Sequence, residues 1–100
     1  MWLLSKYSGT AQVRVTTTQG YRHLDLFSGG TAYESKVGYL KFSQAAVKQI
    51  KKDIEILQTV KKGVVNYEWH FFRSSITGKI GADVRLIQLL ESGGIRIVIH

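Results

Sequence analysis

A pair of glycines, Gly29 and Gly30, is the feature that most constrains the fold, because it lies between two segments rich in strand-forming residues. Glycine readily adopts positive φ, and two such residues form the tight turn of a β-hairpin. The turn also fixes which residues of the two strands face each other. With both glycines at the centre of the turn, Ser28 pairs with Thr31. The sequence therefore predicts an antiparallel hairpin of defined register.

The register of this hairpin places two acidic side chains together. Continuing outward from the turn, Asp25 falls directly opposite Glu34. Two carboxylates in opposite positions repel each other, and a divalent cation between them removes the repulsion. Mg²⁺ binds one or two carboxylates and completes its shell with water and substrate phosphate. The pattern predicts a site for Mg²⁺ or Mn²⁺, with Asp25 and Glu34 as ligands.

The neighbours of the two carboxylates extend this prediction. The backbone carbonyl of Ser35 lies beside Glu34 and can add a metal ligand. Lys36 falls opposite His23, and even spacing places both on the face that carries the carboxylates. Lys36 can hold a water or hydroxide and stabilise charge on a phosphate, whereas His23 can touch phosphate or metal. The alternative is a solvated hairpin face, on which a Glu-x-Lys pair is common.

The remaining pattern predicts a single domain, residues 1–100, of α/β (α+β) class. Residues 43–62 and 82–92 carry apolar side chains at helical spacing. A helix between two strands makes them parallel with a right-handed crossover, which gives a mixed β-sheet flanked by helices. The predicted order is strand 11–18, strand 21–27, strand 32–40, helix 43–62, strand 64–72, helix 82–92 and strand 95–99. The predicted inward side chains are Val47, Ile50, Ile54, Leu57 and Val60 of the first helix, and Val84, Ile87 and Leu90 of the second.

The charge balance favours a polyanionic partner. Fourteen Lys and Arg against seven Asp and Glu give a net charge of +7, which in a small domain is expected to attract nucleic acid. The chain has no cysteine, so disulfides and thiolate chemistry are excluded. It has no apolar run long enough to span a membrane, and we expect no membrane partner. The candidate nucleic-acid contacts are His23, Lys48, Gln49, Lys51 and Lys52.

Aromatic and histidine residues of the fourth predicted strand are expected in the core. Tyr67 and Trp69 lie in the most apolar segment, which favours packing over base stacking. His70 alternates with Glu68 and either lines the site or is a hydrogen-bonded core residue; we favour the core.

The stretch LDLFSGGTAYESK resembles the signature of the PD-(D/E)XK nucleases, in which an Asp ends one strand and Glu-x-Lys lies on its hairpin partner. Residues 21–100, about four-fifths of the chain, further resemble a subgroup found at the C-termini of bacterial polymorphic toxins, including Rhs-type and contact-dependent systems. In that subgroup the Glu-x-Lys strand runs into VGY. A helix bearing Lys and Gln follows, then EWHFF, a Thr-Gly loop and a strand similar to GIRIVIH.

This resemblance implies a restriction-endonuclease-like sheet and a Mg²⁺-dependent endonuclease. Asp25 and Glu34 would be metal ligands, Lys36 the catalytic lysine and Gln49 a supporting residue. Family members usually open with a helix that carries another acidic residue. Here no acidic residue precedes Asp25, and the first ten residues are too short for that helix, so we expect the domain to lack it.

The function expected from these observations is hydrolysis of phosphodiester bonds, in DNA rather than RNA, by a bacterial toxin domain. Such a domain is secreted as part of a larger protein, acts in the cytoplasm of the target cell and is countered by an immunity protein. Two alternatives stay open: an RNA (tRNA)-cleaving toxin, and a non-catalytic nucleic-acid-binding module on the same fold. Pairing of two copies into a homodimer is a further possibility, because it could supply the missing helix.

Overall fold

The computed structural model describes Leu3 and residues 8–100. Its main sheet has five strands in the order β1-β2-β3-β5-β7, and a second sheet pairs β4 with β6. The strands β1, β2 and β3 form an antiparallel meander, whereas β3, β5 and β7 run parallel to one another. The elements are β1 (Thr10–Thr17), β2 (Gly20–Ser28), β3 (Thr31–Val37), β4 (Tyr39–Leu40), α2 (Gln44–Gln58), η1 (Lys61–Gly63), β5 (Asn66–Phe72), β6 (Gly81–Ala82), α3 (Val84–Ser92) and β7 (Arg96–Ile99).

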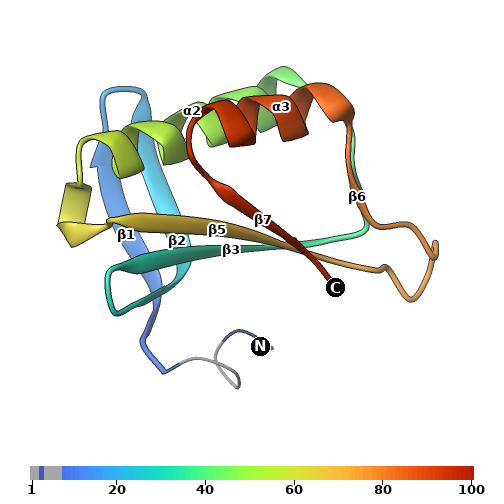
Figure 1. Cartoon of the computed structure of the whole chain (residues 1–100), viewed down its shortest axis with the longest axis horizontal. Coiled ribbons are helices and arrows are strands. Elements are labelled where there is room, and N and C mark those ends of the chain that lie inside the picture. Colours follow the sequence, from blue (N-terminus) through green and yellow to red (C-terminus); the bar gives the residue numbers. More distant parts are fainter. Residues whose placement is uncertain (1–2, 4–7) are drawn as a thin grey trace.

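Both described helices cover the same face of the main sheet (Figure 1). The core between the helices and the sheet contains Leu24, Trp69 and Phe71 from the strands. It meets Ile50 of α2 and Leu90 of α3, and all five side chains are fully buried. The predicted mixed α+β sheet is confirmed, and so is the parallel pairing of the third and fourth long strands. Neither described helix has the length and apolar character to cross a membrane.

The opposite face of the sheet carries a smaller apolar cluster. Leu3 packs there against Leu26 and Tyr33, and all three side chains are buried. The prediction that the first ten residues lack a family-type helix falls largely on positions 1–2 and 4–7, which lie outside the described residues.

The hairpin turn matches the prediction in its centre and its register. Gly29 and Gly30 both have positive φ, 56° and 83°, as a two-residue turn of the hairpin-forming kind requires. Ser28 pairs with Thr31, and the ladder continues to Leu26 and Tyr33. The turn glycines therefore determine the pairing next to them, as expected.

Two predicted boundaries are wrong for reasons of backbone conformation. Gly38, at φ 84°, ends β3 after Val37, so the predicted strand 32–40 is divided and its last residues join β6. The predicted helix 43–62 ends at Gln58. Val60 and Lys62 then adopt left-handed φ values of 52° and 54°, which an α-helix cannot accommodate.

Two predicted inward positions are also wrong. Val60 is 50% exposed because the helix has already ended, and Val84 is 64% exposed at the first turn of α3. Residues that the predicted stripes omitted are buried instead: Ala46, Asp53 and Ile56 on α2, and Leu86 on α3. Asp53 is the functionally important case, since it is a fully buried carboxylate.

Candidate active site

Asp25 lies where strand β2 changes face. Leu24 packs in the core beneath the helices, whereas Leu26, two residues later, packs in the cluster on the other side of the sheet. In a regular strand these two side chains would share a face. The irregularity is at Asp25 itself, because its partner position on β1, Gln12, has φ 55° and both drop out of the ladder. Such a local disruption redirects a side chain, as a β-bulge does.

The carboxylate of Asp25 accepts a backbone hydrogen bond where the backbone pairing of β2 with β3 has ended. The β2–β3 ladder stops at Leu26 and Tyr33, and beyond it the Ser35 backbone N–H donates to Asp25 Oδ2 at 2.8 Å. This contact holds Asp25 beside Glu34, the neighbour of Ser35. The predicted juxtaposition of Asp25 and Glu34 is therefore present, although a side-chain bond secures it in place of the regular backbone pairing.

The pKa values of Asp25 and Glu34 are shifted in opposite directions. Burial raises the pKa of Asp25 to about 7, and the hydrogen bond with Glu34 and its negative charge add to the rise. Burial alone would raise the pKa of Glu34 too, but the hydrogen bond from Asp25 and the positive charges of Arg22 and Lys36 outweigh it and lower that pKa. The two environments push the two pKa values apart, which is a frequent property of catalytic carboxyl pairs.

Glu34 is held by two cations. Arg22 Nη2 donates to Glu34 Oε2 at 2.6 Å, and Lys36 Nζ lies 3.2 Å from the same oxygen. The side chain of Glu34 is 4% exposed, whereas that of Lys36 is 23% exposed. Lys36 also lies over the ring of Trp69, at 5.2 Å from its centroid. The lysine thus reaches solvent from a fixed position beside the buried carboxylate.

The residues that fix Glu34 include two that the sequence analysis missed. Arg22 Nε and Nη2 donate to the two oxygens of Asp53 at 2.7 and 3.1 Å. Trp69 Nε1 donates to Asp53 Oδ2 at 2.9 Å. Helix α2 therefore anchors an arginine of β2, and that arginine clamps Glu34 of β3. The signal that could have found Asp53 is its helical phase, since it lies three residues after the buried Ile50.

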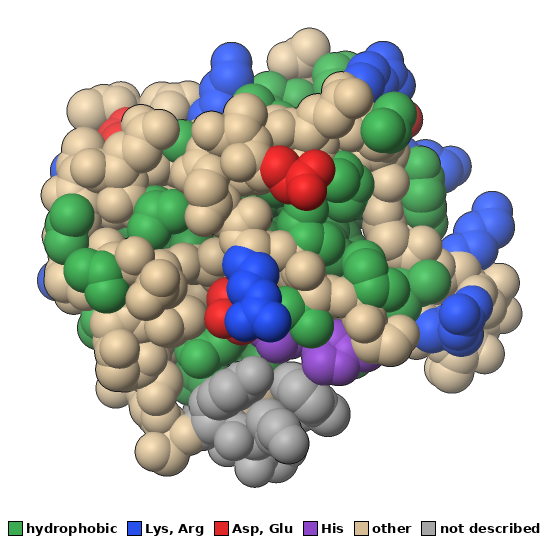
Figure 2. Space-filling view, in the orientation of Figure 1, with side chains coloured by type: hydrophobic (Ala, Val, Ile, Leu, Met, Phe, Trp, Pro, Cys, Tyr) green, Lys and Arg blue, Asp and Glu red, His purple; other side chains and the backbone are tan. Residues whose placement is uncertain are grey.

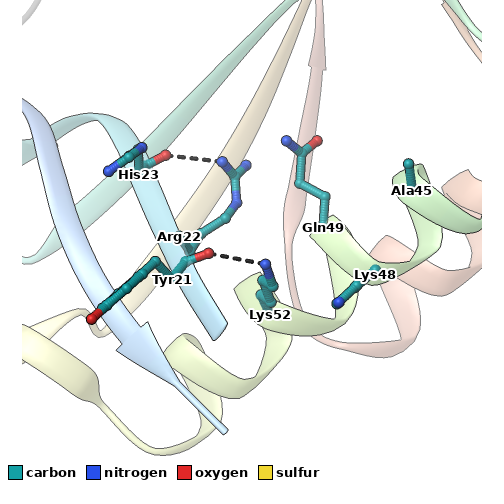
Figure 3. A pocket seen from close by; sticks show the side chains of 7 residues that line it. All are labelled: Tyr21, Arg22, His23, Ala45, Lys48, Gln49 and Lys52. Atoms are coloured by element: carbon teal, nitrogen blue, oxygen red, sulfur yellow. Dashed lines mark hydrogen bonds between the residues drawn. The ribbon is translucent and has the colours of Figure 1, made fainter. Parts of the chain in front are cut away.

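The other predicted site residues are divided between two places. His23 does not join the carboxylates in the ladder; it is exposed and lines a hollow at the start of β2 (Figure 3). Its carbonyl accepts a hydrogen bond from Arg22 Nη1 at 2.9 Å. His70 is buried beneath the other face of the sheet against Tyr33, which confirms the core interpretation. Lys51 is exposed on α2 and does not line the hollow.

A basic hollow of about 360 Å³ lies between the start of β2 and α2 (Figure 3). Arg22, the residue that clamps Glu34, lines this hollow and so links it to the carboxylate pair. Lys52 Nζ donates to the Tyr21 carbonyl at 2.9 Å, which orders one cation at the rim. Gln49 extends its amide toward the same side as the guanidinium of Arg22. Four predicted nucleic-acid contacts therefore converge here: His23, Lys48, Gln49 and Lys52.

The Asp25–Glu34 pair has the donor set for a small divalent ion. Among Leu3 and residues 8–100, no cluster of three or more His, Asp or Glu side chains is arranged as a metal cage. Mg²⁺ needs fewer protein ligands, because it retains several waters and takes substrate phosphate. The negative charge of Glu34 helps to raise the pKa of Asp25, and a cation between the two carboxyl groups would relieve that repulsion. The third carboxylate nearby, Asp53, forms an ion pair with Arg22.

Comparisons with known proteins add no further constraint. No family model matches the chain, and neither the curated proteins nor the solved structures contain a match.

Proposed function

We propose that the protein is a metal-dependent nuclease that hydrolyses phosphodiester bonds, with DNA as the favoured substrate. The observation that carries the proposal is the bond from Ser35 N–H that holds Asp25 beside Glu34, together with Lys36 Nζ at 3.2 Å from Glu34. The fold we propose for this site is the restriction-endonuclease-like sheet, in which such a triad lies on a hairpin.

The residues of the chain would divide the work as follows. Asp25 and Glu34 would hold Mg²⁺ or Mn²⁺, and Ser35 would add its carbonyl; a bound ion acidifies water and neutralises charge on the phosphate. Arg22 fixes Glu34 by a bond of 2.6 Å, so this carboxylate needs little reorganisation. Lys36, being partly exposed, would orient the attacking hydroxide and stabilise charge on the phosphate. Hydrolysis then adds water across the P–O bond.

The basic hollow supports a substrate that is a polyanion. Lys48 and Lys52 would contact backbone phosphates without reading sequence, and the affinity would fall with salt as counterions are released. Arg22 cannot serve as a simple phosphate ligand while it is bound to both Glu34 and Asp53.

The proposed biological role is that of a bacterial toxin domain countered by an immunity protein, and it is supported by the resemblance of residues 21–100 to polymorphic toxins. In that role the domain is exported within a larger protein and acts in the cytoplasm of the target cell. A homodimer is a further part of this proposal.

A second candidate is a nucleic-acid-binding module without catalysis. This candidate is favoured because two cations, Arg22 and Lys36, contact the same oxygen of Glu34, Oε2. A buried carboxylate neutralised in this way forms a stable ionic cluster with no metal present.

The decisive experiment is cleavage of supercoiled plasmid and of tRNA by the purified protein, with Mg²⁺ and with a chelator. We expect cutting that requires the metal and is lost in Glu34→Gln and in Lys36→Met. Asp83→Asn is the matched control, since Asp83 caps α3 through a 2.9 Å bond from Arg85 N and Asn caps equally well. Cutting that survives both site substitutions would refute the nuclease, and salt-sensitive binding without cutting would select the second candidate.

A further inference from the structure

A second hollow lies at the C-terminal end of β3, one residue beyond Lys36. It has a volume of about 360 Å³, and its lining includes Val37, Tyr39 and Thr77. The Gly38 backbone N–H donates to the Phe72 carbonyl at 2.9 Å, which joins the ends of β3 and β5 under the hollow. The position is therefore fixed relative to the candidate active site.

The loop that forms the far wall is held by its own hydrogen bonds. Ser74 N–H donates to the Lys79 carbonyl at 2.9 Å, and Gly78 N–H donates to the Ser74 carbonyl at 2.9 Å. Ser74 Oγ in turn accepts bonds from the backbone of Ile76 and Thr77, each at 3.1 Å. This closed turn gives the hollow a wall that exists before any ligand binds.

The charge of this surface favours an anion. Lys41 and Lys79 line the hollow, and Arg73 is exposed beside it on the same loop. Basic side chains gather at the edge of the molecule that this loop occupies (Figure 2). The acidic side chain nearby, Asp83, is bound by Arg85 at 3.0 Å, so its charge is compensated.

The same surface exposes flat apolar groups, which phosphate contacts alone do not explain. Tyr39 is 46% exposed and Phe42 is 40% exposed. The guanidinium of Arg85 lies over the Phe42 ring at 3.9 Å from its centroid, which holds that ring in place. Ile76, in the loop that follows β5, is 93% exposed. Aromatic side chains among cations are the pattern by which proteins bind single strands, whose bases stack on the rings.

We infer that this hollow binds an unpaired nucleotide next to the phosphate that the active site would cut, so that the preferred substrate is single-stranded or locally unpaired nucleic acid. A paired base hides its faces in the duplex stack, and a duplex would therefore leave the exposed ring of Tyr39 without a base to stack on. The inference rests on the proposed function for the identity of the polymer, and it names the strand form.

The test measures binding and does not depend on cutting. Fluorescence anisotropy in chelator would compare a labelled single strand with a hairpin duplex of the same length, using the full chain. We expect Tyr39→Ala to weaken single-strand binding by about fivefold or more, the usual loss for one stacked base, and duplex binding by less than about twofold. Tyr39→Phe keeps the ring and should retain the affinity.

Val65→Ala is the control, because Val65 is 58% exposed and precedes the opposite end of the parallel β3–β5 pair. It should bind as wild type does. Three results would overturn the inference: equal losses of affinity for the single strand and the duplex, no loss of affinity in Tyr39→Ala, or no binding of either oligonucleotide by the wild type. The last result would point to a protein partner. Tyr39-dependent binding without any cleavage would support it while refuting the nuclease.

Discussion

Replacing Asp25 with Asn should stabilise the protein, and only above a defined pH. In the folded chain the pKa of Asp25 is raised to about 7 from an ordinary value of 3.8, first by burial and then by Glu34. The folded state therefore keeps a proton that the unfolded state releases near pH 4. By linkage, the free energy of unfolding falls as pH rises from about 4 to about 7.

The size of the effect follows from the same change. A shift from 3.8 to about 7 would correspond to about 4 kcal/mol in a fully buried site. Asp25 is only partly buried, and solvent screening reduces this to about 2 kcal/mol. Asn preserves the contacts of the protonated acid, since its oxygen can accept from Ser35 N–H and its amide can donate to Glu34.

The assay is urea unfolding followed by tryptophan fluorescence, in chelator, between pH 4.5 and 8. The difference in free energy of unfolding, Asp25→Asn minus wild type, should be near zero at pH 4.5 and reach about 2 kcal/mol at pH 8. The lowered pKa of Glu34 acts in a different window: its stabilisation is present above about pH 4.5 and is lost below it. A difference that stays constant over this range, or falls with pH, would refute the reasoning.

Asp83→Asn provides the matched control. The pKa of Asp83 is lowered by its hydrogen bonds from Arg85, so this carboxylate is ionised throughout the range from pH 4.5 to 8. Its substitution should change stability by an amount that does not vary with pH over that range.

The remaining predictions concern packing and the buried ionic cluster. Asp53→Asn should lower the free energy of unfolding in urea by about 3 kcal/mol, because it leaves the buried guanidinium of Arg22 without its main counter-charge. Trp69→Phe is the comparison variant, because it removes only the indole N–H bond to Asp53 and reduces the size of the ring. If Asp53→Asn costs no more than a surface substitution, the clamp contributes nothing to folding. Gly93→Ala should destabilise by about 1–3 kcal/mol, because its Cβ would lie 2.3 Å from Cγ1 of Ile54. The added substitution Ile54→Ala should recover part of that loss, and full additivity of the two costs would contradict a direct clash.

Local sequence patterns were enough where a single interaction decides the conformation. The two turn glycines fixed the hairpin register, and helical periodicity located α2 and α3. Patterns predicted the wrong boundary where the backbone conformation of one residue ends an element, as Gly38 ends β3 at a positive φ. They also failed at Val60, since apolar spacing continues past the point where the backbone leaves the helix.

The candidate site likewise contains one contact that could be predicted from the sequence and one that could not. The proximity of Asp25 and Glu34 could be predicted because a hairpin brings near residues together, although the bond from Ser35 N–H that secures it could not. The Arg22–Asp53 clamp could not, because its partners are 31 positions apart and belong to a strand and a helix whose relative placement depends on the whole core.

By itself, then, the sequence determined the hairpin, its pair of carboxylates, the adjacent lysine and the excess of positive charge, all of which depend on short-range geometry or on composition. Only the tertiary structure decided which oxygens the cations hold, which of the two carboxyl groups keeps the proton, and that Tyr39 and the loop after β5 meet at the end of β3. Those outcomes depend on burial and on contacts between distant segments, and the free energy of a charge is set by what surrounds it once the core has formed.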